Sequence, residues 1–213
     1  MDLRIWVGLF HTDPNKQGGG GRTWELVSRF IWQLPQTTVG LFYSHSANTI
    51  YGRVNSVEYT SGVTVVDVDD LLWDFDQARG VTLSNYIHGM GIGTDPNEVN
   101  ADGEITPEAR LLRHEYGHYV QSQKVGPLYL FKYGIPSAAR AGWTEDDAEY
   151  RSDQYFLENE NVSPHFEAGY PRNYTPVNPE WWEYAIFFGS GVAGGAGGYV
   201  IGGLVVSGLN IER

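Results

Sequence analysis

The 213-residue chain contains no cysteine, which excludes disulfide bonds and thiolate metal ligands. A metal site in this protein must therefore use histidine and carboxylate ligands. Basic residues are also scarce, since 14 Lys and Arg stand against 26 Asp and Glu, for a formal net charge of −12. This charge argues against nucleic acid, or an anionic membrane, as a partner held by charge. It favours cationic or neutral substrates through electrostatic steering.

A secretory signal peptide is not apparent either. The start Met1-Asp2-Leu3-Arg4 has mixed charge, and the apolar stretch 5–10 is short and lacks a small-residue cleavage site. Export by the usual route is therefore not predicted. The composition, with 41% hydrophobic and 14% aromatic residues, suits one globular domain. We place this domain at residues 1–180, followed by a glycine-rich hydrophobic tail at residues 181–213.

The most informative motif is the run from Arg113 to His118, which matches HExxH. On a helix, His114 and His118 lie one turn apart on one face, where both imidazoles can bind one metal ion. Glu115 lies beside that face. It is placed to take a proton from a metal-bound water rather than to bind the metal. The motif predicts a Zn²⁺ hydrolase with Glu115 as general base; the alternative is an ordinary amphipathic helix with two histidines.

A third ligand must come from further along the chain. Thr144 is a candidate N-cap of a second helix, on which Glu145 and Glu149 lie one turn apart. A glutamate ligand followed four residues later by a carboxylate that orients a histidine is the thermolysin-like arrangement. This favours Glu145 as ligand and Glu149 as the partner of one imidazole N–H. The alternative register uses Glu149 as ligand with Asp153 behind it.

Two tyrosines of the same predicted helix, Tyr150 and Tyr155, are candidates for polarising a substrate carbonyl. The alternative role for an aromatic residue at helical spacing is packing.

Several segments together resemble one family, the metallopeptidase-like bacterial domains found as free proteins or at the C-termini of Rhs/YD-repeat proteins. The pattern is HEYGHYxQS, then GIPS, then an E-x-D-A helix ending in Tyr-Phe. It is carried here by residues 28–37, 81–87, 95–97, 113–122, 126–129, 134–137 and 145–156. The resemblance covers roughly residues 8 to 160. One departure is the longer acidic stretch from Glu98 to Glu108 ahead of the predicted active-site helix.

The resemblance implies a gluzincin-like zinc metallopeptidase, with His114, Glu115, His118 and Glu145 in the motif positions. It implies a peptide or protein substrate. It also implies a toxin-related setting, in which an immunity or inhibitor protein is a candidate partner. Three cellular locations remain as alternatives: the bacterial cytoplasm, association with a membrane, and delivery by a secretion system.

The segments before the motif predict a small β-sheet. Residues 53–59 and 63–68, joined by Thr60-Ser61-Gly62, predict a hairpin, and residues 81–88 a further strand. Residues 22–34 predict a helix that faces the core with its apolar side and ends at Pro35. The expected fold is α+β and zincin-like, with the sheet ahead of the HExxH helix and a second ligand-bearing helix behind it. In such a fold, the 81–87 strand is a candidate edge for binding an extended peptide.

The tail carries no charged residue from Tyr184 to Leu209, and glycines recur in it at four-residue spacing. The run is long enough to cross a bilayer, and Trp181, Trp182 and Arg213 resemble interfacial anchors. A glycine-rich hairpin that contacts a membrane through residues 184–209 is one hypothesis. A glycine-rich tail that is flexible or buried is the other.

The sequence therefore predicts a zinc metalloendopeptidase that hydrolyses peptide bonds. Two alternatives from other classes stay open. One is a non-catalytic interaction or structural module that retains the zinc scaffold. The other is a membrane-active, toxin-associated domain whose tail is the active part.

Overall fold

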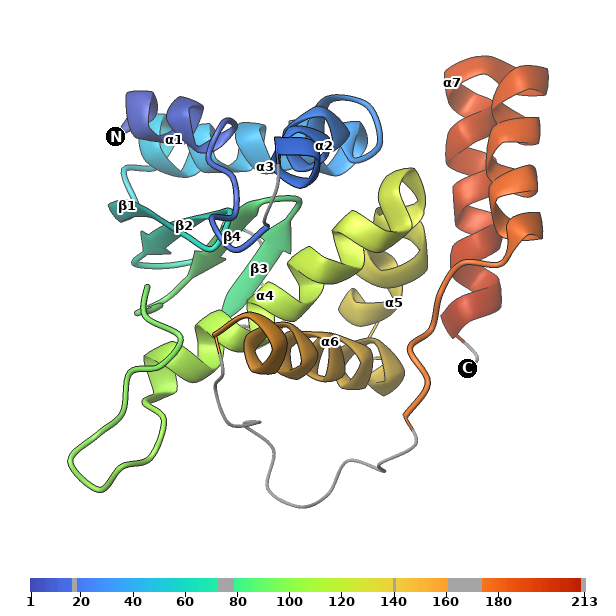
Figure 1. The fold of residues 1–213 in the computed structure, drawn as a ribbon. Coiled ribbons are helices and arrows are strands. Elements are labelled where there is room, and N and C mark those ends of the chain that lie inside the picture. The colour runs from blue at the N-terminus through green and yellow to red at the C-terminus, as the bar shows by residue number, and fades with distance from the viewer. Residues whose placement is uncertain (17–18, 73–78, 140, 161–173, 212–213) are drawn as a thin grey trace.

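The computed structural model describes residues 1–16, 19–72, 79–139, 141–160 and 174–211. Its fold is mixed α+β, with a small four-stranded sheet among helices (Figure 1). The strands are β1 (Val54–Thr60), β2 (Val63–Val68), β3 (Gly80–Leu83) and β4 (Tyr86–Gly89), in the order β1-β2-β4-β3. The β1/β2 and β3/β4 pairs are antiparallel, and β2 and β4 are parallel. The predicted α+β class and β1–β2 hairpin are confirmed.

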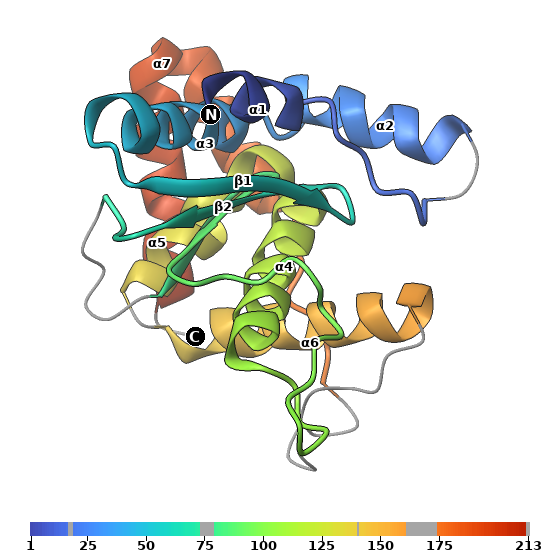
Figure 2. The same cartoon turned by 90° about the vertical axis from the view of Figure 1, so that its left-hand side faces the viewer.

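Helices cover both faces of the sheet (Figure 2). On one face lie α1 (Asp2–Gly8), α2 (Gly19–Phe30) and α3 (Leu34–His45), followed by a π-helical turn at Ser46–Ile50. On the other lie α4 (Pro107–Val125) and α6 (Gly142–Glu160). Between α4 and α6 come a 3-10 turn (Gly126–Leu128), a π-helical turn (Leu130–Gly134) and the short α5 (Ile135–Ala138). The chain ends in α7 (Trp181–Ile211).

Side chains alternate between the two faces of the sheet along each strand, so one part of the hydrophobic core lies on each face. Val65 and Ile87 pack toward α4 and α6 with Leu112 and Tyr116. The other face joins α1 to the sheet through a cluster that includes Ile5, Leu9, Val57, Val66 and Tyr86. This burial fixes α4 against the sheet, with the HExxH residues near β3.

Two predictions of secondary structure were wrong. Residues 81–88 form two strands rather than one, because the chain reverses at Ser84 and Asn85, with Ser84 at φ +59. Pro35 does not end a helix; it lies in the first turn of α3, where its missing N–H costs no helical hydrogen bond. The GIPS segment, residues 134–137, lies largely in the short helix α5.

The predicted orientation of the helix at residues 22–34 was also wrong. Its apolar side is exposed, and the side that faces the protein is polar. Glu25 and Arg29 form a buried ion pair at 3.0 Å, and Arg29 donates to the carbonyl oxygens of Leu9 and Gly62. Tyr119 of α4 donates to Glu25 at 2.6 Å. This buried polar network holds the polar side of α2 against the protein, so the apolar residues of α2 point away from the core.

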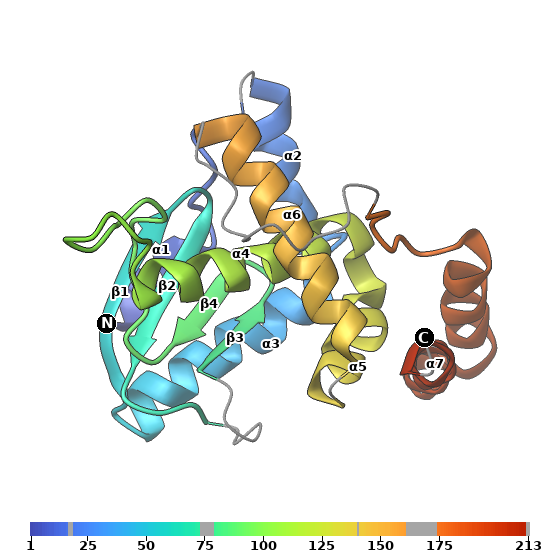
Figure 3. The same ribbon diagram turned by 90° about the horizontal axis from the view of Figure 1, so that it is seen from below.

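The tail residues form a helical hairpin that reverses at Gly195, whose φ of +58 is a conformation that glycine adopts readily. Figure 3 shows the hairpin to one side of the body. Its base is held by a fully buried ion pair between Lys132 and Glu183, with Nζ 2.7 and 2.8 Å from the two carboxylate oxygens. The proposed anchor Arg213 lies outside the described residues, and the domain boundary at residue 180 stays a prediction.

Candidate metal centre

The HExxH residues lie in the middle of α4, which has clear end signals. Thr106 caps its N-terminus, accepting from Ala109 N–H at 3.2 Å, and Pro107 occupies the first turn. The helix ends at Val125, before Gly126 at φ +64. The site residues therefore lie on a rigid, mostly buried helix.

A close crossing of α4 and α6 brings the two predicted ligand helices together (Figure 3). Gly117 of α4 contacts the backbone of Ala148 of α6, and a Cβ at Gly117 would overlap the carbonyl oxygen of Ala148. Ser152 adds a hydrogen bond of 2.6 Å to the carbonyl oxygen of Arg113. Only glycine at position 117 permits this approach, which sets the separation of the histidines from Glu145.

We expect Gly117→Ala to lower the free energy of unfolding by about 1–3 kcal/mol, because the added methyl forces the two helices apart. Zinc uptake should fall in the same variant. The measurements are urea unfolding of the metal-free protein and zinc content after reconstitution. Gly142→Ala is the matched control, since a Cβ there meets nothing within 4 Å. Equal unfolding midpoints for wild type and Gly117→Ala would contradict the role given to this contact.

Three side chains converge at the crossing. Glu145 Oε2 lies 3.1 Å from His114 Nε2 and 3.3 Å from His118 Nε2. One ligand atom from each residue falls within 4.8 Å of the others, a group that can hold a metal ion. Ligand atoms of a tetrahedral zinc with bonds near 2.0–2.1 Å are about 3.3 Å apart. The donor set and both histidine-to-glutamate distances fit zinc.

Each imidazole is oriented by a hydrogen bond at its second ring nitrogen, Nδ1. His114 Nδ1 lies 2.6 Å from Glu149 Oε1, and His118 Nδ1 lies 2.8 Å from Gln121 Oε1. The amide nitrogen of Gln121 donates to Thr144 O and Asp147 Oδ2, so its oxygen is the atom that faces His118. Both rings therefore carry their proton on Nδ1 when neutral and direct an Nε2 lone pair at Glu145.

Two lone pairs facing a carboxylate require a cation between them, either a proton on the ring or a metal ion. The pKa values follow this geometry. Burial disfavours charged histidine, but Glu145 and Glu149 outweigh it and hold the pKa of His114 well above its usual value. Burial is likewise outweighed by Glu145 at His118, whose pKa is raised. Burial also opposes ionisation of Glu145, yet the histidines lower its pKa far below the usual range.

Glu145 is itself positioned by hydroxyl groups. Its other oxygen, Oε1, accepts from Ser137 Oγ at 2.5 Å and from Thr144 Oγ1 at 3.1 Å. The predicted capping role of Thr144 was wrong, because α6 begins two residues earlier, at Gly142. Thr144 instead donates to Ala141 O from inside the first turn.

Glu115 is buried between α4 and the sheet edge. Thr82 Oγ1 of β3 donates to Glu115 Oε2 at 2.6 Å and to the Glu115 carbonyl oxygen at 3.0 Å. A Cβ at Gly80 would overlap the same carboxylate, so β3 passes directly against it. Tyr129, also buried, lies 3.4 Å from the carbonyl oxygen of Thr82. The carboxylate is thus fixed in place and adds to the negative potential at both histidines.

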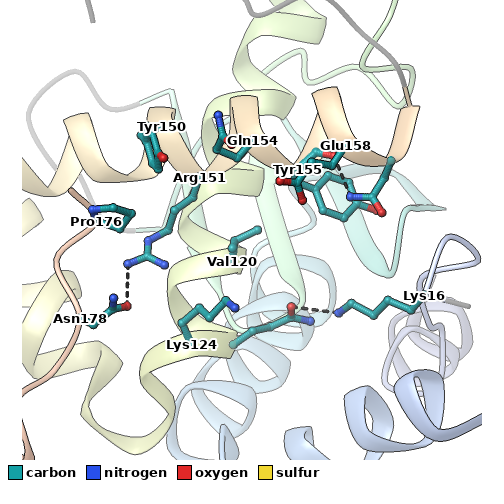
Figure 4. Close-up of a pocket in the computed structure, with 12 residues that line it drawn as sticks. Lys16, Val120, Lys124, Tyr150, Arg151, Gln154, Tyr155, Glu158, Pro176 and Asn178 are labelled. Atoms are coloured by element: carbon teal, nitrogen blue, oxygen red, sulfur yellow. Dashed lines mark hydrogen bonds between the residues drawn. The ribbon is translucent and has the colours of Figure 1, made fainter. Parts of the chain in front are cut away.

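The described contacts of the two predicted tyrosines lie away from the metal-ligand group. Tyr155 donates to Asp13 Oδ2 at 2.7 Å and packs on Tyr116, while Tyr150 packs on Tyr174. Both line a cavity of about 470 Å³ along the far halves of α4 and α6, which contains none of the three ligand residues (Figure 4). Packing, the alternative role, accounts for Tyr155.

Sequence reasoning missed Gln121, Thr82 and Ser137. Gln121 lies three residues beyond His118, on the same helix face, so its spacing was an available signal. Thr82 and Ser137 reach the site only through the fold, and no local pattern marks them.

Comparisons with protein-family models, curated proteins and solved structures gave no significant match to this chain. The inference of function therefore depends on the geometry of the site.

Proposed function

We propose that the protein is a zinc-dependent peptidase with a zincin-like site. The observation that carries this proposal is the convergence of His114 Nε2, His118 Nε2 and Glu145 Oε2, with Glu115 buried beside them. Two histidines and one glutamate are the protein ligands of catalytic zinc sites that keep a fourth position open for water. Zinc bound here would lower the pKa of such a water to about 7 and polarise a substrate carbonyl.

The chain's own residues perform the remaining steps. Glu115 accepts the proton of the attacking water and passes it to the leaving amine, as a general base and then a general acid. Thr82 holds the Glu115 carboxylate in one orientation. Glu149 and Gln121 hold the imidazoles with Nε2 toward Glu145, and such partners are worth about 10–100-fold in metal affinity or activity.

An extended peptide has a natural binding edge in β3, which is the outermost strand on its side of the sheet. One side of β3 pairs with β4, and the strand passes directly against Glu115. Main-chain pairing with β3 would place a scissile carbonyl near the metal ligands. We thus assign the peptide-binding role predicted for residues 81–87 to the shorter strand Gly80–Leu83.

The decisive experiment is hydrolysis of an unstructured peptide library by protein stripped with a chelator, before and after addition of one equivalent of zinc. We expect no cleavage without metal and restored cleavage with zinc, because the attacking water is otherwise not activated. Magnesium, which prefers oxygen ligands, is the control and should not restore activity. Stoichiometric zinc binding without cleavage of any peptide would contradict a peptidase and favour the structural module.

A further inference from the structure

In the hairpin α7, small residues lie between the two arms and large apolar residues face outward, the reverse of a helix pair in a water-soluble protein. Its two arms pack through small residues: a Cβ at Gly198 would overlap the carbonyl oxygen of Ser190, and one at Gly191 the ring of Tyr199. Large aliphatic side chains point outward instead. Val192 is 86% exposed and Ile201 65%, and Val200, Leu204, Val205 and Leu209 are also exposed. In water this arrangement leaves apolar area unburied, whereas in lipid it is the usual way in which helices associate.

The hairpin is not explained as a core helix or as a leader segment. It is apolar enough to cross a membrane by composition, yet it is mostly exposed and lies far from the N-terminus. Its arms, 181–194 and 196–211, are about 21 and 24 Å long at 1.5 Å per residue, and a bilayer core is about 30 Å thick. Each arm alone is therefore too short to span, and the hairpin suits partial insertion from one side.

Contacts with the body involve the half of the hairpin away from its bend. Phe187 and Val206 are buried against the turn that carries Phe131, and Lys132 pairs with Glu183. In Figures 1 and 2 the bend projects at the side of the molecule where α1, α2 and α3 lie. The bend and this helical layer can therefore meet one surface together.

That layer carries a second exposed apolar surface. On and just after α1, Leu3, Trp6, Val7 and Phe10 recur at helical spacing and are all exposed. On α2 and the residues after it, Trp24, Val27, Phe30 and Ile31 are exposed, and Leu3 and Trp24 reach 76% and 62%. The rings of Phe10 and Phe30 lie 6.1 Å apart, which joins the two stripes. Large continuous patches of this kind mark a binding surface.

Charge distinguishes this layer from the rest of the acidic chain. Residues 3–57 contain only two carboxylates, Asp13 and Glu25, and both are buried. Arg4 and Arg22 are exposed among the apolar residues. Asp2, at the edge of the layer, is engaged by His45 at 2.8 Å. The overall charge of −12 therefore lies elsewhere, and this side does not repel phosphate headgroups.

We propose that α1, α2 and the bend of α7 form one lipid-binding side, with the α7 bend inserted into a bilayer and α1 and α2 lying in its interface. Interfacial helices with an apolar stripe and arginines bind lipid in this way. The sheet lies between the α1, α2 and α3 layer and the helices α4 and α6, which carry the candidate metal ligands (Figure 1). The proposal does not depend on the peptidase activity.

The test is sedimentation of the full chain with phosphatidylcholine vesicles, pure or with phosphatidylglycerol. We expect the wild type to bind both, the mixed vesicles at least as strongly, with no change on chelation. Leu3→Glu with Trp24→Glu, and Val192→Glu with Ile201→Glu, should each lower partitioning at least about tenfold, because a charge replaces a buried apolar group. Val99→Glu, an exposed apolar residue in the loop before α4, is the matched control and should bind as wild type.

Three results would overturn the proposal. The first is a wild type that stays in solution with both kinds of vesicle. The second is binding that neither pair of substitutions weakens. The third is a stable oligomer in lipid-free solution that the same substitutions disperse, which would make this side a contact between copies of the chain. Urea unfolding of each variant, measured in parallel, verifies that the fold is retained, whether or not the chain binds zinc.

Discussion

Glu115→Gln is expected to reduce peptide hydrolysis about 10²–10⁴-fold while leaving zinc content unchanged. Glutamine keeps the size of the side chain, and its amide oxygen can still accept from Thr82 Oγ1, which donates to Glu115 at 2.6 Å in the wild type. The fold and the metal ligands are therefore retained. What is lost is the ability to take a proton from the attacking water, so the loss should appear in kcat.

The measurement is kcat and KM for a cleaved peptide, with zinc determined on the same samples. Glu108→Gln is the matched control, an exposed carboxylate in the first turn of the same helix, and it should keep full activity. Glu115→Asp keeps a base but withdraws it by one methylene, so we expect partial activity. A Glu115→Gln variant that retains zinc and hydrolyses peptide at the wild-type rate would exclude Glu115 as the general base.

The ligand helices could be predicted from sequence because their signals are local. The four-residue spacing of His114 and His118 fixes their common face on any helix. Gly126 and Pro127, which are typical helix-ending residues, directly follow Val125, the last residue of α4. The hairpin of β1 and β2 was equally accessible, since a turn sequence separates two β-branched runs.

The failures have one physical cause, which is that a periodic pattern shows where an apolar face lies but not what covers it. The helix predicted at residues 22–34 and found at 19–30 is amphipathic, yet its polar side is buried. Glu25 and Arg29 find partners in residues 9–13, in the β1–β2 turn and on α4. Long-range hydrogen bonds of this kind produce no pattern in the local sequence. The same holds for Thr82 and Ser137 at the candidate metal centre, where they are placed by β3 and α5.

The turn at Ser84 and Asn85 was missed for a different reason. The stretch from Val81 to His88 was predicted as one strand because it is rich in strand-forming residues, and its reversal depends on Ser84 adopting a positive φ. Its hydroxyl lies 2.7 Å from Thr37 Oγ1, and Asn85 donates to Gly8 O at 2.9 Å. Contacts with α1 and α3 thus stabilise a turn that the strand propensities alone oppose.

Glu145→Ala is expected to abolish stoichiometric zinc binding, whereas Glu149→Ala should keep zinc with about 10–100-fold lower affinity. The difference follows from position. Glu145 Oε2 lies within 3.3 Å of both Nε2 atoms, while Glu149 Oε1 contacts His114 only at Nδ1, on the far side of the ring. Under the proposed assignment, loss of Glu145 removes a ligand, whereas loss of Glu149 only releases the orientation of one imidazole.

The measurement is zinc per chain at a buffered free zinc concentration, with thermal unfolding as a second readout. At 100 times its Kd, zinc stabilises a folded protein by about 2.7 kcal/mol, so Glu145→Ala should lose this increment. Glu158→Ala, an exposed carboxylate on the same helix, is the control and should behave as wild type. The opposite pattern, with zinc lost in Glu149→Ala and kept in Glu145→Ala, would move the ligand one turn along α6 and favour the register with Asp153 behind Glu149. Zinc retained in both variants would place the third ligand outside α6.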